Sequence, residues 1–236
     1  PVANPGGPYS VVEGGSILLD GSRSTDDGTI VSYEWFVDDV SVGMGVNFIY
    51  TTDKLPGTYD VDLTVTDDGE PVETHTAGTT LTVSEKIECG DTLTEGSYTL
   101  VEDLDCGAIG DALTIEDDDV TLDCGGYKIS GTGINGINVA SDTETSIKDI
   151  SVVDCELDGF DNGLLINLVE DSSFTEIYIL DSTNAGIKLD NSNDNTLTGG
   201  ISDGESRGVF LFESDGNELT FEEINNSGGY YVQVSD

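Results

Sequence analysis

The chain has 236 residues, of which 48 are Asp or Glu and only 7 are Lys or Arg, and its formal net charge at pH 7 is -41. This charge argues against nucleic acid and anionic membrane surfaces as partners, because both are bound by basic surfaces. No run of about 18 apolar residues occurs, so we expect no membrane insertion by this segment. We also find no basic, apolar leader at its start.

A folded chain with this charge repels itself. Molar salt screens such repulsion, and calcium bridges carboxylates directly through its hard oxygen ligands. The composition therefore predicts an extracellular protein in a saline or calcium-rich environment.

The first part of the chain, residues 1–85, is typical of a β-sandwich. Apolar stretches separated by polar turns predict strands over residues 16–20, 30–37, 46–52, 58–67 and 79–84. Within "TYDVDLTVTD" apolar and polar residues alternate, which gives one buried and one exposed face. Trp35, the single tryptophan, is the expected anchor of the core.

The order "LDGSRS", "DDGTIVSYEW" and "PGTYDVDLTVTD" resembles the PKD (polycystic kidney disease) domain, an immunoglobulin-like module of extracellular proteins. The chain departs from the family at "WFVDDV", where the family usually has Asp-Phe-Gly-Asp-Gly after its tryptophan. Because some PKD domains bind calcium at the acidic turn, the resemblance implies Asp26 and Asp27 as metal ligands. The alternative is a plain Asp-rich turn, which the backbone favours by itself.

The second part, residues 86–236, repeats a short unit led by Gly, as in "GINV", "GLLI", "GIKL" and "GVFL". Gly186, Gly208 and Gly229 are 22 and 21 residues apart, and a period of this size indicates a solenoid. The unit lacks helical periodicity and the leucine-rich signature, so we predict a right-handed parallel β-helix of about six coils.

Three sets of stacked positions follow from the repeat. Asn195 and Asn217 should stack at a corner. One inward ladder should contain Leu113, Ile137, Leu164, Ile187, Val209 and Tyr230. The next should contain Ile115, Val139, Ile166, Leu189, Leu211 and Val232.

The stretch "CGDTLTEGSYTLVEDLDCGAIGDALTIEDDDVTLDCGGYKISG" resembles the opening of the β-helix domains of surface and periplasmic proteins, which are common in archaeal surface proteins and related in fold to pectate lyases. The resemblance implies an all-β chain, a PKD sandwich followed by a β-helix. It leaves function open, because members range from enzymes to pure scaffolds.

The four cysteines, Cys89, Cys106, Cys124 and Cys155, form no CxxC, and the only histidine, His75, lies outside their region. This spacing disfavours a zinc or thioredoxin-like site and favours two disulfides in an extracellular protein. Three of the cysteines follow an Asp, and we expect these Asp-Cys pairs to occupy equivalent places in successive coils. Four cysteines allow three connectivities, of which Cys89–Cys106 with Cys124–Cys155 fits the order of coils best.

The β-helix contains no histidine, and its few cations are scattered, so we predict no catalytic site and a protein that is not an enzyme. The sequon Asn225-Asn226-Ser227 is a candidate glycosylation site. The preferred hypothesis is a structural or adhesive protein of the cell surface, such as an S-layer, sheath or filament segment, whose partners are other surface subunits or copies of itself.

The alternative is a carbohydrate-binding or carbohydrate-cleaving module, with Phe210, Phe212 and Tyr231 as the outward aromatic residues.

Overall fold

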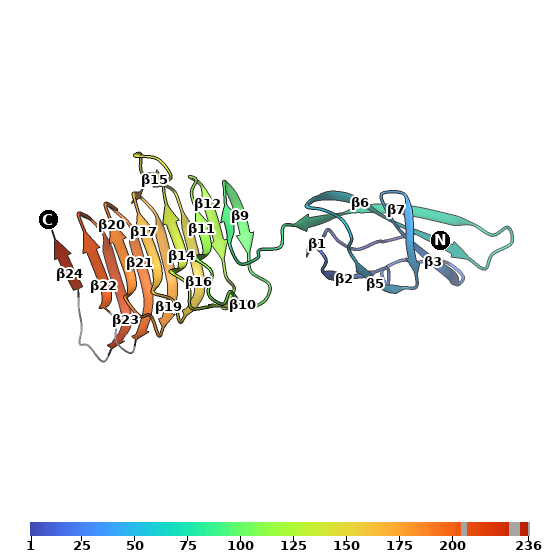
Figure 1. Cartoon of the computed structure of the whole chain (residues 1–236). Coiled ribbons are helices and arrows are strands. Elements are labelled where there is room, and N and C mark those ends of the chain that lie inside the picture. The colour runs from blue at the N-terminus through green and yellow to red at the C-terminus, as the bar shows by residue number, and fades with distance from the viewer. Residues whose placement is uncertain (204–206, 227–231, 236) are drawn as a thin grey trace. The chain divides into compact units, whose positions relative to one another are not determined.

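The computed structural model describes residues 1–203, 207–226 and 232–235, and the chain divides into two compact units, Pro1–Lys86 and Ile87–Asp236 (Figure 1). Every regular element among these residues is a β-strand, and none of them forms a helix able to cross a membrane. Each unit has its own apolar core.

The first unit is a β-sandwich. Its larger sheet has the order β1 (Tyr9–Val12), β7 (Thr74–Ser84), β6 (Gly57–Asp67), β3 (Ile30–Val37) and β4 (Val40–Met44), and its smaller sheet pairs β2 (Ser16–Asp20) with β5 (Asn47–Thr51). Trp35 is fully buried between them, and its Nε1 donates a hydrogen bond to the carbonyl oxygen of Gly45 over 2.9 Å. The predicted role of Trp35 is confirmed, whereas β1 and β4 were not predicted.

The stretch "WFVDDV", where the chain departs from the usual PKD sequence, forms a tight hairpin between β3 and β4. Asp38 and Asp39 occupy its two turn positions and both have positive φ, at 47° and 61°. Two successive left-handed residues match the twist of a two-residue hairpin, and Asp tolerates this conformation better than most residues.

The second unit is a right-handed parallel β-helix with two main faces. Sheet 1 contains β8 (Asp91–Leu93), β11 (Asp111–Ile115), β14 (Asn135–Ala140), β17 (Asn162–Asn167), β20 (Ala185–Asp190), β22 (Arg207–Phe212) and β24 (Val232–Ser235). Sheet 2 contains β9 (Gly96–Thr99), β10 (Leu104–Asp105), β12 (Val120–Asp123), β13 (Lys128–Ser130), β16 (Ser151–Asp158), β19 (Ser173–Leu180), β21 (Thr196–Asp203) and β23 (Glu218–Asn226).

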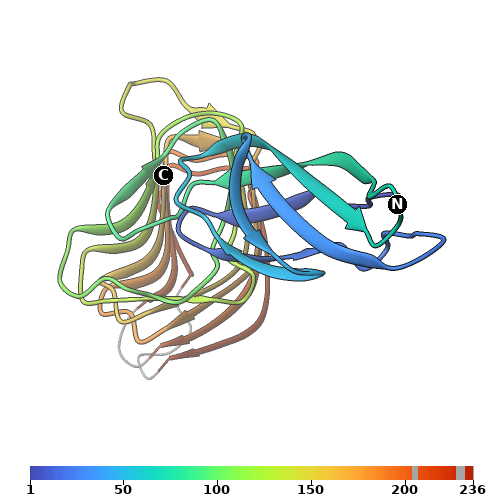
Figure 2. The same ribbon diagram turned by 90° about the vertical axis from the view of Figure 1, so that its right-hand side faces the viewer.

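A short third ladder pairs β15 (Ile147–Lys148) with β18 (Val169–Glu170) at the corner between the two sheets. The chain makes about five turns between β11 and β24, after a less regular first turn that starts at β8. Figure 2 views the coils end-on, and they superimpose into one outline from which the loop before β15 projects.

The inward ladders are confirmed from the second turn onward. Each predicted residue from Leu113 to Val209 in the first ladder, and from Ile115 to Leu211 in the second, is at most 6% exposed. The prediction is wrong at the last coil, where the backbone of Val232 pairs with Val209 rather than with Leu211. The last turn is longer than the Gly spacing indicated, and Tyr230 lies outside the described residues.

The glycines near the start of β14 and β17 are required by stacking. A β-carbon on Gly136 would lie 2.7 Å from the carbonyl oxygen of Gly163, and one on Gly163 would lie 2.8 Å from that of Gly186. Both distances are shorter than real β-carbon contacts, so a larger residue would push neighbouring coils apart.

Asparagine side chains connect the coils at two places. At the predicted corner the Asn195 amide donates to the Asn217 Oδ1 over 3.1 Å and to the Val169 carbonyl over 2.9 Å, which confirms the stacking. A second ladder, which was not predicted, runs from Asn184 through Asn162 to Asn135 with bonds of 2.8 Å each.

We predict that Asn195→Ala lowers the free energy of unfolding of the β-helix by about 3 kcal/mol, because buried partners lose their hydrogen bonds. The Asn195 Oδ1 also accepts from the backbone N–H of Ser172, and the side chain is only 1% exposed. Urea unfolding followed by circular dichroism measures the loss. The control, Thr220→Ala on the exposed surface of β23, should change stability by less than about 0.5 kcal/mol. Equal stability of both variants would contradict a structural role for the ladder.

Candidate functional site

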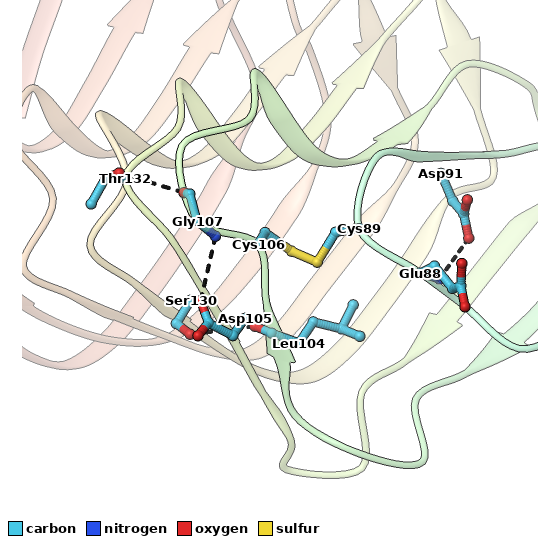
Figure 3. The surroundings of a disulfide bond; sticks show 9 residues. All are labelled: Glu88, Cys89, Asp91, Leu104, Asp105, Cys106, Gly107, Ser130 and Thr132. Carbon is cyan, nitrogen blue, oxygen red and sulfur yellow. Dashed lines mark hydrogen bonds between the residues drawn. A yellow bond between two sulfur atoms is a disulfide. The ribbon is translucent and has the colours of Figure 1, made fainter.

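Two disulfides connect the early coils of the β-helix. Cys89, which precedes the first turn, bonds to Cys106 within that turn, and Cys124 bonds to Cys155 in the following coils. This is the pairing expected from the order of the coils. Figure 3 shows Cys106 between Asp105 and Gly107. The Cys106 N–H donates to the Ser130 carbonyl, and the Gly107 carbonyl accepts from the Thr132 N–H, so both connect this stretch to the next coil. All four thiols are therefore used covalently, and the described residues contain no free cysteine.

The prediction that the three Asp-Cys pairs form one ladder is wrong. Asp123 pairs with Val153, one residue before Asp154, and Asp154 has a positive φ of 56° within the long strand β16. Asp105 instead aligns with Ser130 and Asp158, at the far end of sheet 2. In the first two pairs the aspartate accepts a hydrogen bond from the glycine after the cysteine, so its role is to hold a turn.

An acidic groove follows the corner that leads into sheet 2. It has a volume of about 430 Å³, and aspartates and hydroxyl residues of three successive coils line it, namely Asp149, Ser151, Asp171, Ser173, Asp194 and Thr196. The three aspartates have φ values of 59°, 49° and 56°. The left-handed conformation favours Asp, Asn or Gly, so the backbone restricts these positions to a few residue types without selecting aspartate among them.

This row of left-handed residues was missed from the sequence, although its spacing of 22 and 23 residues was readable. It continues to Asp119 in an earlier coil and to Gly216 in a later one, both with positive φ. Neighbouring coils are about 4.8 Å apart, so the row stacks like charges along the corner.

An aromatic patch covers the outer surface of β20 and β22. We define it as Lys188, Asp190, Arg207, Phe210 and Phe212. Lys188 pairs with Phe210, and Asp190 pairs with Phe212, across the two strands. Both phenylalanines are half-buried and alternate with the buried Val209 and Leu211, which confirms that they point outward. Tyr231, the third predicted aromatic residue, lies outside the described part of the chain.

A charged cluster on sheet 2 is a clamp between coils. The Lys128 Nζ lies 2.8 Å from the Glu156 Oε1 and 3.1 Å from the Asp158 Oδ2. These two acceptors raise the pKa of Lys128 above its ordinary value. A lysine held in its charged form is a poor general base, so the cluster does not indicate proton abstraction.

The predicted metal ligands Asp26 and Asp27 lie in the turn before β3. The Asp26 Oδ2 accepts from the Gly28 N–H over 2.9 Å, while its Oδ1 lies 3.0 Å from the Pro1 nitrogen, a contact that lowers the pKa of Asp26. Asp27 is exposed. No group of three or more His, Cys, Asp or Glu side chains with metal-binding geometry occurs in the described ranges, so calcium binding here stays a prediction.

Two further residues of the sequence analysis are His75 and Asn225. His75 is exposed on β7, and its Nδ1 accepts a hydrogen bond from the Ala3 N–H over 2.9 Å. Asn225 belongs to β23, where its backbone pairs with Ser202. The Asn225 side chain and Ser227 of the sequon lie outside what the structure describes.

Two family models match the two parts of the chain, and they meet near the boundary between the two structural units. A family model described as "PKD domain" matches residues 1–83, and one described as "Periplasmic copper-binding protein (NosD)" matches residues 71–235. A solved structure of Clostridium thermocellum CbhA fibronectin(III)-like modules aligns with 35% of this chain and 97% of its own, at 17% identity and a TM-score of 0.29. A score of that size carries no argument about this chain.

Removal of either disulfide should destabilise the β-helix by about 3–4 kcal/mol, because loops of 17 and 31 residues are released in the unfolded state. The paired variants are Cys89→Ser with Cys106→Ser, and Cys124→Ser with Cys155→Ser. Urea unfolding by far-UV circular dichroism measures the change. Fluorescence of Trp35 reports the first unit alone and serves as an internal control. A β-helix midpoint unchanged by both paired variants would refute the stabilising role.

Asp171→Asn should raise the Tm of the β-helix by about 1–3 °C in 0.1 M NaCl, because asparagine keeps the left-handed backbone while one stacked charge is removed. The difference in Tm between the variant and the native chain should become smaller in 2 M NaCl, where charge is screened. Asp142→Asn, on the loop before β15, is the matched control. A lower Tm of Asp171→Asn than of the native chain in added CaCl₂ would instead indicate that the groove binds calcium.

Proposed function

The chain belongs to the NosD family, with a PKD domain preceding its β-helix, and from this premise we propose that it is a structural and adhesive module of the cell surface. The two disulfides agree with a protein outside the cytoplasm. The observation that carries the proposal is the parallel stacking of coil on coil, which makes a stiff rod in a chain whose charged residues are mostly acidic.

The proposed mechanism is mechanical. Each coil is joined to the next by backbone ladders, asparagine amides and, in the early coils, disulfides. Extension of the rod must break these bonds together. The acidic surface keeps subunits apart in dilute salt, and screening or bridging by cations lets them approach. A non-catalytic role is part of this proposal.

Copper, which the family description names, does not fit the donor set of this chain. Copper sites use soft thiolate or thioether ligands together with imidazole. All four cysteines form disulfides, and the sequence has one Met and one His. Met44 lies on β4 and is 66% exposed, while the Nδ1 of His75 already accepts a hydrogen bond. We therefore propose no copper-dependent step for this β-helix.

The second candidate function is recognition of carbohydrate. It is favoured by the aromatic patch, because Phe210 and Phe212 are outward-facing rings that the apolar core does not need. Cleavage is not part of this second candidate, and Lys128, the basic group on sheet 2, is engaged in ion pairs with Glu156 and Asp158.

We expect the purified chain to remain dispersed in 0.1 M NaCl and to form ordered sheets or fibres when calcium is added or NaCl reaches molar concentration. Light scattering followed by electron microscopy detects the assemblies. Dissolution by a chelator would assign the contacts to calcium, whereas assembly in NaCl with chelator present would assign them to charge screening. A monomer under every condition would overturn self-assembly.

A further inference from the structure

The aromatic patch differs from the rest of this acidic chain. Among only seven Lys and Arg residues, two lie on neighbouring strands of one surface, beside two phenylalanines. Lys188 and Asp190 have side chains that are 29% and 26% exposed, so both remain accessible from outside. Tyr178, the comparable aromatic residue on sheet 2, is 41% exposed but has Glu156 and Gly200 as its strand partners.

The charged groups of the patch are held in fixed positions. The Lys188 Nζ lies 3.3 Å from the Asp190 Oδ2, and the Asp190 Oδ1 accepts a hydrogen bond of 2.8 Å from the Asn191 amide. The Arg207 guanidinium lies 5.2 Å from the centre of the Phe210 ring. Such pre-organised donors and acceptors lose little conformational entropy when a ligand binds.

The two rings lie side by side on one strand. Phe210 and Phe212 lie two residues apart on β22, and they share a surface with Leu165 and Asn167 two coils earlier. Each coil adds about 4.8 Å along the axis, so Leu165, Lys188 and Phe210 follow one another in a line across three coils. An extended ligand with apolar faces and hydroxyl groups can contact both the rings and the polar side chains of this surface.

The negative charge of the chain around the aromatic patch limits which ligands can bind there. A net charge of -41 repels polyanions such as uronate polymers. Within the patch the lysine is paired with a carboxylate, so the patch does not offer a strong cationic field either. The ligand class that fits is an uncharged sugar. Its apolar face can stack on an aromatic ring, and its hydroxyl groups can hydrogen-bond to the polar side chains around the rings.

We propose that the outer surface of β20 and β22 binds a neutral polysaccharide, with Phe210 and Phe212 as stacking platforms and Lys188, Asp190 and Arg207 as hydrogen-bonding partners. This inference rests on the second proposed function and gives it a site and a ligand class. It is independent of self-assembly, which depends on the acidic surface.

Affinity electrophoresis tests the proposal with soluble β-1,3-glucan, xylan, galactomannan and dextran as probes, and with alginate as the anionic comparison. We expect retardation by at least one neutral polymer and none by alginate at low salt. Phe210→Ala with Phe212→Ala should weaken binding at least tenfold. Tyr178→Ala is the matched aromatic control on sheet 2 and should bind as the native chain does.

Unchanged circular dichroism and Tm of the double variant establish that it remains folded. If folding fails, Lys188→Gln with Arg207→Gln provides a second variant, for which we also expect weaker binding. Equal retardation of the native chain and the folded patch variants would overturn the site. Retardation by none of the neutral polymers would overturn the ligand class, while the scattering experiment would still decide the cell-surface assembly proposal by itself.

Discussion

Parallel stacking of one coil on the next is the constraint on which the β-helix depends. Each position in a strand meets its equivalent in the neighbouring coil about 4.8 Å away. The size and type of side chain that a position accepts are therefore set by the equivalent positions in the coils on either side. Leu164 must lie between Ile137 and Ile187, and Gly163 must leave room for the carbonyl of Gly186. The repeat in the sequence is the direct result of this geometry.

The same stacking makes the acidic surface costly. Asp149, Asp171 and Asp194 lie in one row because each corner needs a residue that tolerates a left-handed backbone. Asparagine or glycine would serve the backbone equally well, so the choice of aspartate concerns charge rather than fold. A chain that places carboxylates in rows is suited to an environment in which salt or cations reduce their repulsion.

Function on this scaffold is confined to the outer surfaces, because the interior is filled by apolar side chains and by amide ladders. Among the described surfaces, the acidic groove and the aromatic patch have opposite chemistry. The groove is lined by aspartates and hydroxyl residues, and the patch offers apolar rings with paired charges. A rod with these two faces can pack against neighbours through one and hold a polymer on the other, which joins the two proposed functions in one molecule.

The sequence by itself determined the two-part organisation and the inward ladders, because both depend on alternation and on a fixed repeat. It also indicated the Asn195–Asn217 stack, since equal residues at an offset of 22 must meet in a solenoid of that period. The disulfide pairing was only favoured by the order of coils, because sequence left three connectivities open.

Only the tertiary structure decided the rest. Asp123 pairs with Val153 rather than with Asp154, and Asp105 aligns with Asp158. The longer last turn places Val232 opposite Val209. A periodicity in the sequence does not show such local differences in register and loop length. The asparagine ladder at Asn135 and Asn162 and the grouping of Lys188 with Phe210 depend on which strands become neighbours. That adjacency is set by the register of the coils.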